Sequence, residues 1–240
     1  MKWSKNSHVG LVTKNNEDNC CVLDDIPLLA VADGMGGHKA GEIASKMALD
    51  SMVSYLRGNP VIVKENPSEA LKLALDHANS TVYGYARQEG DKYRGMGTTI
   101  AAVLPGDCQI YIAHVGDSRV YLLRGEDIRL LTNDHSLVNE LVRSGGLTAE
   151  EAESHPQRNI ITRAIGTSPS VEVDVDLEPV EKGDIILLCT DGLSNRVNLE
   201  EIKQMAGNNE SLAQRAQHLI ERALEQGGED NVTVILYQVD

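Results

Sequence analysis

Three apolar segments of this chain each meet an aspartate at one end. The junctions are residues 29–32 before Asp33, residues 186–190 before Asp191, and residues 232–235 after Asp230. Short apolar runs bounded by turn-forming residues are typical of buried strands. Because a buried strand holds its backbone rigidly, each of these aspartates should have a fixed position at the edge of a sheet.

The rest of the pattern predicts how such strands are covered. Apolar stripes with helical spacing predict helices over residues 41–57, 68–88 and 210–226. Further strand-like runs lie at residues 98–104, 109–115, 119–123, 128–131, 171–177, 184–189 and 232–237. We interpret residues 98–131 as an antiparallel meander. Since the helices form two groups separated by strands, the pattern favours an α+β fold: two stacked antiparallel β-sheets flanked by helices on both outer faces, an α-β-β-α sandwich.

The composition excludes several classes of function. A net charge of −14 should repel nucleic acid and anionic membranes, and an aromatic content of 3% is too low for base stacking. No run of about 18 apolar residues predicts a membrane span, and no signal-peptide core follows Met1. The four cysteines form no C-x-x-C pair and fit reduced thiols. We therefore expect a cytoplasmic monomer that binds neither nucleic acid nor membrane.

Two interpretations of the aspartates stay open at this point. Asp-Gly and Asp-Asn pairs are ordinary turn residues. Converging carboxylates, in contrast, need a compensating cation, and hard oxygen ligands favour Mg²⁺ or Mn²⁺. Residues 33–38 contain three glycines in four positions, which would let the backbone approach a ligand, but they match neither a P-loop nor a dinucleotide fingerprint. These residues alone indicate an acidic divalent-metal site that is compatible with phosphate chemistry.

A family resemblance extends this interpretation. Residues 31–38, VADGMGGH, resemble the signature of the bacterial branch of the type 2C metal-dependent serine/threonine protein phosphatases. Further motifs follow in the family's order, at residues 16–18, 95–99, 114–119, 134–136, 161–166, 189–193 and 228–233. The resemblance covers essentially the whole chain. It implies one catalytic domain over residues 1–240, with a small flap at about residues 136–166.

The resemblance also implies a set of metal ligands for two Mn²⁺ or Mg²⁺ ions. Asp33 would bridge both ions and the Gly34 carbonyl would bind one of them, with Asp191 and Asp230 completing the set. Glu17 and Asp18 would hold metal-bound waters, Asp18 ligating through water or directly. In bacterial members a third ion is bound at the position of Asp117.

The expected reaction is hydrolysis of phosphoserine or phosphothreonine in proteins, without a covalent intermediate. Two ions about 4 Å apart can share a water and lower its pKa, so that the resulting hydroxide attacks phosphorus. His38 is the nearest candidate to protonate the leaving oxygen, although a helix-start or substrate-contact role is the alternative. Phosphorylated proteins are the expected partners, among them a serine/threonine kinase or its substrates. A weakly active phosphoprotein-binding regulator and a small-phosphoester hydrolase are the rival functions.

One position departs from the family's pattern. An Arg that binds the substrate phosphate usually stands three residues before the Asn of the N-[EQ]-D string, and this chain has Thr13 there. Thr offers one hydroxyl where Arg offers a charged fork. Lys14 follows, but adjacent residues on an extended segment face opposite sides. We therefore expect weaker phosphate binding around Thr13 and Lys14.

Other polar residues of the motifs have structural interpretations. His114 lies in a predicted strand, so we expect a hydrogen-bonded structural histidine. Arg119 and Arg163 should tie loops to carboxylates, and we assign neither to the substrate.

Overall fold

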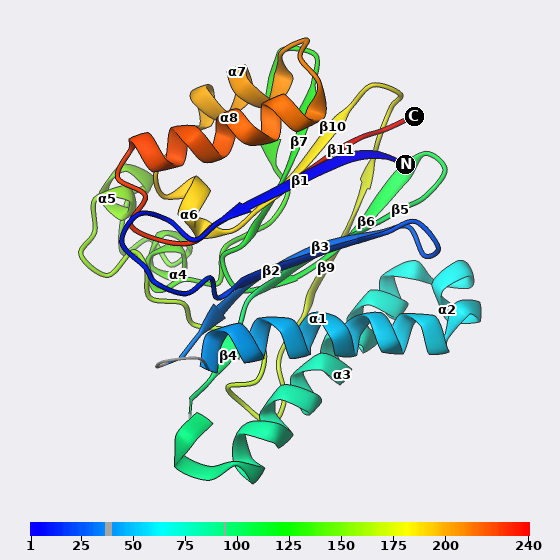
Figure 1. Cartoon of the computed structure of the whole chain (residues 1–240), viewed down its shortest axis with the longest axis vertical. Coiled ribbons are helices and arrows are strands. Elements are labelled where there is room, and N and C mark those ends of the chain that lie inside the picture. The colour runs from blue at the N-terminus through cyan, green and yellow to red at the C-terminus, as the bar shows by residue number, and fades with distance from the viewer. Residues whose placement is uncertain (37–39, 94) are drawn as a thin grey trace.

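The structure is a computed structural model, and it describes residues 1–36, 40–93 and 95–240. Two antiparallel sheets lie face to face, with a pair of helices on the outer side of each (Figure 1). This arrangement confirms the predicted α-β-β-α sandwich.

The first sheet, called sheet 1 here, contains both ends of the chain (Figure 1). Its strands are, in spatial order, β1 (Lys2–His8), β11 (Val232–Gln238), β10 (Ile185–Cys189), β7 (Arg119–Arg124) and β8 (Asp127–Leu130). Sheet 2 has the order β2 (Asp18–Leu23), β3 (Leu28–Met35), β5 (Ile100–Pro105), β6 (Gln109–Val115) and β9 (Asp174–Pro179). The short β4 (Gly97–Thr98) pairs with the end of β3.

Strand β3 explains why its sequence is a continuous apolar run. Leu28, Ala30 and Ala32 face the helices, whereas Leu29 and Val31 face sheet 1. Successive side chains of a strand point to opposite faces, so a strand that is covered on both sides needs apolar residues at every position. The apolar run ends at Ala32, and the next residue is Asp33, the first of the predicted aspartates.

Helices cover both outer faces. On sheet 2 lie α1 (Ala40–Gly58) and α3 (Pro67–Gln88), and on sheet 1 lie α7 (Leu199–Gly207) and α8 (Leu212–Glu225). The three predicted helices agree with α1, α3 and α8 to within two residues. Two helices were not predicted from the sequence: α7 and the six-residue α2 (Pro60–Glu65). Both are too short to give a clear stripe of apolar residues at helical spacing.

The predicted meander is wrong at its centre. Strands β5 and β6 form one hairpin and β7 and β8 another, but β6 belongs to sheet 2 and β7 to sheet 1. The chain crosses between the sheets at residues 116–118, where Gly116 has a φ of 108°. Turn residues are visible in a sequence, but the sheet to which the next strand belongs depends on packing. The polar edge strand β1 was also missed, since residues 2–8 lack an apolar run.

The segment of residues 136–166 contains two short helices, α4 (Leu137–Arg143) and α5 (Ala149–Glu153). An isolated bridge between Ser136 and Ile161 joins its two ends. The remaining short elements are the 3-10 helix η1 (Gly90–Tyr93) and α6 (Asp191–Ser194). Among the described helices, none combines the length and apolar character needed to cross a membrane.

Candidate metal centre

Two of the predicted ligands lie directly opposite each other on sheet 2. Asp18 is the register partner of Asp33 in the β2–β3 pair, so both side chains emerge on the same face. The backbone of Asp33 is fixed by its neighbours: Thr99 N donates to its carbonyl at 2.8 Å, and Asp33 N donates to Thr99 Oγ1 at 3.0 Å. The Thr98 hydroxyl donates to the same carbonyl at 2.8 Å. These bonds hold the first junction as a rigid corner.

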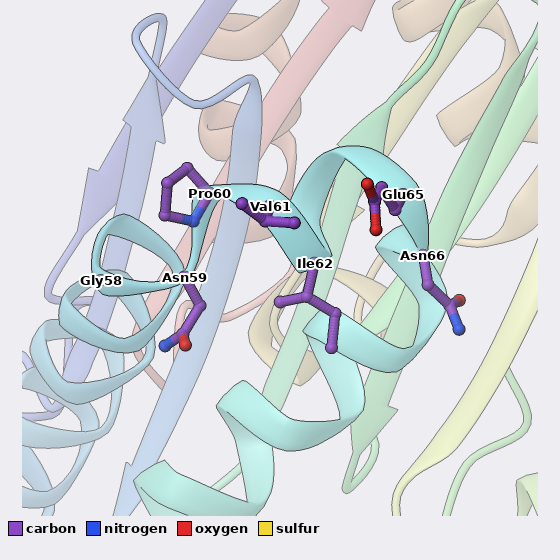
Figure 2. A pocket seen from close by; sticks show the side chains of 7 residues that line it. All are labelled: Gly58, Asn59, Pro60, Val61, Ile62, Glu65 and Asn66. Atoms are coloured by element: carbon purple, nitrogen blue, oxygen red, sulfur yellow. The ribbon is translucent and has the colours of Figure 1, made fainter.

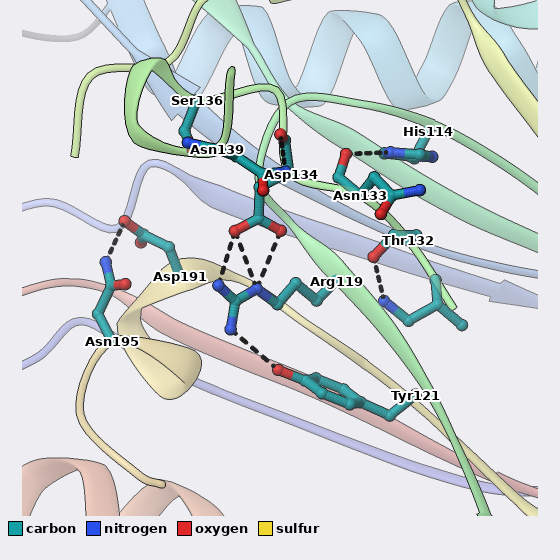
Figure 3. A network of polar contacts seen from close by, with 11 residues as sticks. His114, Arg119, Tyr121, Thr132, Asn133, Asp134, Ser136, Asn139, Asp191 and Asn195 are labelled. Atoms are coloured by element: carbon teal, nitrogen blue, oxygen red, sulfur yellow. Dashed lines mark hydrogen bonds and ion pairs between the residues drawn. The ribbon is translucent and has the colours of Figure 1, made fainter. Parts of the chain in front are cut away.

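Asp191 approaches from sheet 1. It follows β10 as the first residue of α6, and its Oδ2 accepts a hydrogen bond from Asn195 Nδ2 at 2.9 Å (Figure 3). The preceding Thr190 is fully buried and donates its hydroxyl to Asp18 Oδ2 at 2.8 Å. Thr190 therefore links the strand ends of the two sheets at the point where their carboxylates meet.

Asp230 is held by its neighbour Asn231, just before β11. Asp230 Oδ1 accepts from Asn231 N at 2.8 Å, while Asn231 Oδ1 accepts from Glu17 N at 2.6 Å. The Asn231 amide also donates to the carbonyls of Val9 and Asn15, at 2.8 and 3.0 Å. One buried amide thus fixes Asp230 and the segment that carries Glu17 relative to each other.

The carboxylates strongly perturb one another. Burial raises the pKa of Asp33 well above its usual value, and further carboxylates add to this effect: Asp18, Asp191, Asp117 and Asp230. Burial likewise raises the pKa of Asp18 and of Asp117 to about 7. The pKa of Asp191 rises to about 6 through burial and the charge of Asp230. Protons or cations must therefore compensate this cluster near neutral pH.

The cluster fits a divalent cation better than protons alone. Asp18 Oδ1 and Asp191 Oδ1 are buried and have no hydrogen-bond partner among the described residues. A buried anionic oxygen without a partner carries a large desolvation cost, which a bound cation offsets. The donors are all oxygens, which suits Mg²⁺ or Mn²⁺ and not the softer zinc or copper.

Gly34 is required for a different reason from the one expected. A Cβ at this position would lie 2.1 Å from the carbonyl oxygen of Gly41 and 2.6 Å from that of Glu17. The glycine therefore lets the start of α1 pack against the end of β3. A Cβ on Gly41 would in turn lie 2.1 Å from Glu17 Oε2. Glycine at position 41 therefore leaves room for the Glu17 carboxylate, whose pKa is raised by burial and then by the charge of Asp230.

Three residues were expected to contact the substrate: Thr13, Lys14 and His38. The hydroxyl of Thr13 donates to the carbonyl of Val9 and accepts from Asn231 Nδ2 at 2.9 Å, so internal contacts already engage it. Lys14 is exposed. His38 lies outside the described residues.

The predicted structural residues behave as expected. His114 is buried and its Nε2 lies 2.9 Å from the carbonyl of Asn133. Arg119 binds the carboxylate of Asp134 through Nε at 3.0 Å and Nη2 at 2.6 Å, and it also contacts Tyr121 (Figure 3). Arg163 pairs with Asp174 at 2.6 Å.

A cleft of about 640 Å³ opens beside this centre. Asp117 and Asp191 line it together with residues of α4, α5, α6 and α7. Besides Arg119, the cleft is lined by two arginines that were not predicted as site residues, Arg158 and Arg196. The only signal for Arg196 is its position five residues after Asp191, and Arg158 lies within the polar segment of residues 136–166.

A second hollow lies where α1, α2 and α3 meet. Figure 2 shows its lining, residues 58–62, 65 and 66, with Glu65 as the one ionisable side chain among them. Its volume is about 340 Å³. With a single carboxylate and no acid–base pair, this hollow offers little chemistry, so the cleft beside the carboxylates is the candidate site.

Comparison with known proteins agrees with this geometry. Residues 12–232 match the family model of protein phosphatase 2C. The serine/threonine phosphatase stp of Listeria monocytogenes is 40% identical over 235 residues, covering 96% of this chain and 93% of that protein. The S. agalactiae serine/threonine phosphatase has a similar structure, with a TM-score of 0.93 at 39% identity and coverage of 100% of this chain and 99% of that one. The catalytic domain of PstP, solved in complex with two manganese ions, gives a TM-score of 0.88 at 37% identity, with coverage of 100% and 98%. This chain therefore belongs to the protein phosphatase 2C family.

Proposed function

We propose that this chain is a metal-dependent protein serine/threonine phosphatase that hydrolyses phosphoserine and phosphothreonine. The observation that carries the proposal is a pair of buried oxygens where the two sheets meet, Asp18 Oδ1 and Asp191 Oδ1, which have no hydrogen-bond partner in the part of the chain that the structure describes. The family match over residues 12–232 and the named phosphatases among the relatives support it.

Two divalent ions are the cofactors in this proposal, as in the related PstP domain with its two manganese ions. Asp33, the Gly34 carbonyl, Asp191 and Asp230 would hold the two ions, with Glu17 and Asp18 binding through water. Asp117 would hold a third. Such ions supply a water of lowered pKa and offset the charge of the phosphoryl oxygens.

The chain's own residues position this chemistry. Thr190 orients Asp18 through a 2.8 Å hydrogen bond, and Asn231 orients Asp230. The cleft of about 640 Å³ would receive the protein segment that carries the phosphorylated residue. Arg158 supplies positive charge there, in a chain whose net charge is −14, and Arg196 lies in the same lining with its guanidinium paired to Glu229. We keep His38 as the candidate that protonates the leaving oxygen.

The biological setting is part of the same proposal. Residues 1–240 would act as one catalytic domain with residues 136–166 as its flap. Phosphoproteins, including a serine/threonine kinase or its substrates, would be the partners of a monomeric cytoplasmic enzyme. Mutual charge effects speak against the rival phosphoprotein-binding regulator, because Asp18, Asp191 and Asp230 lie close enough to Asp33 to raise its pKa.

One assay separates these functions. The protein is given Mn²⁺ and a phosphothreonine peptide, the matched phosphotyrosine peptide, or p-nitrophenyl phosphate. We expect the phosphothreonine peptide to be hydrolysed with the highest kcat/KM. Preference for p-nitrophenyl phosphate would indicate a small-phosphoester hydrolase. Binding of the phosphothreonine peptide without turnover would indicate the regulator.

A further inference from the structure

His135 makes two hydrogen bonds to one residue of the loop that carries Asp117. His135 N donates to the carbonyl of Gly116 at 3.0 Å, and Gly116 N donates to His135 Nδ1 at 3.0 Å. Gly116 packs closely against Thr99, since a Cβ there would lie 2.5 Å from Thr99 Cγ2. His135 is 5% exposed. Both backbone groups of Gly116 are therefore fixed by one buried residue.

The same histidine joins the two ends of the flap segment. Its carbonyl accepts from Thr162 N at 2.8 Å, and the next residue, Ser136, forms the bridge to Ile161. Leu137 N then donates to the carbonyl of Ile160 at 2.8 Å. His135 thus lies where the flap leaves the body of the protein and where it returns.

The hydrogen bonds also orient the ring. Because Gly116 N–H points at Nδ1, that atom is the acceptor of this bond. Nε2 lies 3.4 Å from Asp174 Oδ2, and Arg163 holds Asp174 from the other side at 2.6 Å. His114 stacks on the ring with a centroid distance of 4.7 Å. The imidazole is therefore held in its plane and on one of its faces.

A metal ion is a poor alternative for this cluster. Ligand atoms of His114, His135 and Asp174 do lie within 4.8 Å of one another. However, Arg163 Nη1 lies 3.1 Å from Nε2 of His135, so a guanidinium already occupies the side of the ring where an ion would bind. The guanidinium already supplies the positive charge that Asp174 needs.

We infer that His135 is a positioning residue that couples the flap to the Gly116–Asp117 loop through its Nδ1. This inference rests on the proposed function, in which Asp117 binds a third ion and the flap borders the substrate cleft. Without the bond to Nδ1, the Gly116 N–H loses its partner and the loop can move relative to the flap. Both ion binding at Asp117 and peptide binding should then weaken.

Two isosteric substitutions test the role of Nδ1. In His135→Asn, the amide oxygen takes the place of Nδ1 and can accept from Gly116 N–H. In His135→Gln, the amide reaches the place of Nε2 and leaves Gly116 N–H unpaired. Outer-shell substitutions at metal sites typically cost about 10–100-fold. We expect that loss in kcat/KM and in calorimetric Mn²⁺ affinity for His135→Gln, and a loss of less than about threefold for His135→Asn.

Limited trypsin digestion gives a readout that does not depend on activity. Arg143 and Arg158 of the flap are exposed, and His135→Gln should speed cleavage at them, whereas His135→Asn should not. Two results would overturn the inference. One is an equal effect of His135→Asn and His135→Gln; the other is a His135→Gln protein that matches the wild type in kcat/KM, Mn²⁺ affinity and rate of trypsin cleavage. An inactive wild-type protein would count against the proposed function alone, because digestion and calorimetry would still decide the role of His135.

Discussion

Thr190, at the end of β10 in sheet 1, donates its hydroxyl to Asp18 Oδ2, at the start of β2 in sheet 2, at 2.8 Å. The same Thr190 oxygen accepts from Thr233 N at 3.0 Å. This buried hydroxyl connects β10 and β11 to the carboxylate that lies opposite Asp33. A side chain that is not itself a predicted ligand therefore helps to align the candidate centre across the two sheets.

Replacing Thr190 by Val should weaken ion binding. The change leaves Asp18 Oδ2 and Thr233 N without this partner, at a cost of about 1–3 kcal/mol in stability. Asp18 loses a hydrogen bond that favours its charged form, so its raised pKa should rise further and compete with the cation. We expect about 10–100-fold weaker Mn²⁺ activation, measured as the half-saturating concentration. Thr190→Ser keeps the hydroxyl and should show Mn²⁺ activation close to that of the wild type. Weak activation in Thr190→Ser would show that the hydrogen bond to Asp18 is not the cause.

The metal-free protein should lose stability as the pH rises from about 4 to about 7. In the folded state, burial raises the pKa to about 7 for Asp18 and Asp117 and to about 6 for Asp191, each above the ordinary aspartate value of 3.8. Between these values the folded state binds more protons than the unfolded state, so stability falls with increasing pH. We expect a lower Tm in EDTA at pH 7.5 than at pH 5.5. With Mn²⁺ present, Tm should instead be higher at pH 7.5 than at pH 5.5. A Tm in EDTA that rises from pH 5.5 to pH 7.5 would contradict the raised pKa values of these aspartates.

Replacing Thr13 by Arg should improve phosphate binding. The new guanidinium can bind the phosphate of a small phosphoester with two hydrogen bonds, so KM for p-nitrophenyl phosphate should fall. The change also removes the contacts of Thr13 with Val9 and Asn231, which should cost about 1 kcal/mol of stability. Thr13→Ser, which keeps the hydroxyl, is the matched control and should leave both KM and Tm close to wild type. An unchanged or higher KM in Thr13→Arg would reject the idea.

The sequence predicted the strands of the fold better than their assignment to sheets. Residues 28–32 end at Asp33 as expected, because burial on both faces leaves a continuous apolar run. The crossing at Gly116 was not predictable, since a turn residue does not reveal which sheet receives the next strand. The family's motif order supplied the expected two-sheet architecture independently.

The site was predictable to different degrees. The aspartates lie at strand ends, and that signal is local in sequence, so the pattern alone singled out Asp33, Asp191 and Asp230 as candidates. The role of Thr190 depends on a contact with Asp18, 172 positions away, which no local pattern shows. The engagement of the Thr13 hydroxyl by Asn231 was missed for the same reason.

The most direct test of the metal centre is phosphate release from a phosphothreonine peptide by the wild-type protein and by Asp33→Asn. Asp50→Asn, which changes an exposed helical carboxylate, is the matched control. We predict that the wild type and Asp50→Asn release phosphate in Mn²⁺ but not in excess EDTA. Asp33→Asn should remain folded and release no phosphate in either condition. Turnover that survives EDTA, or a fully active Asp33→Asn, would contradict it.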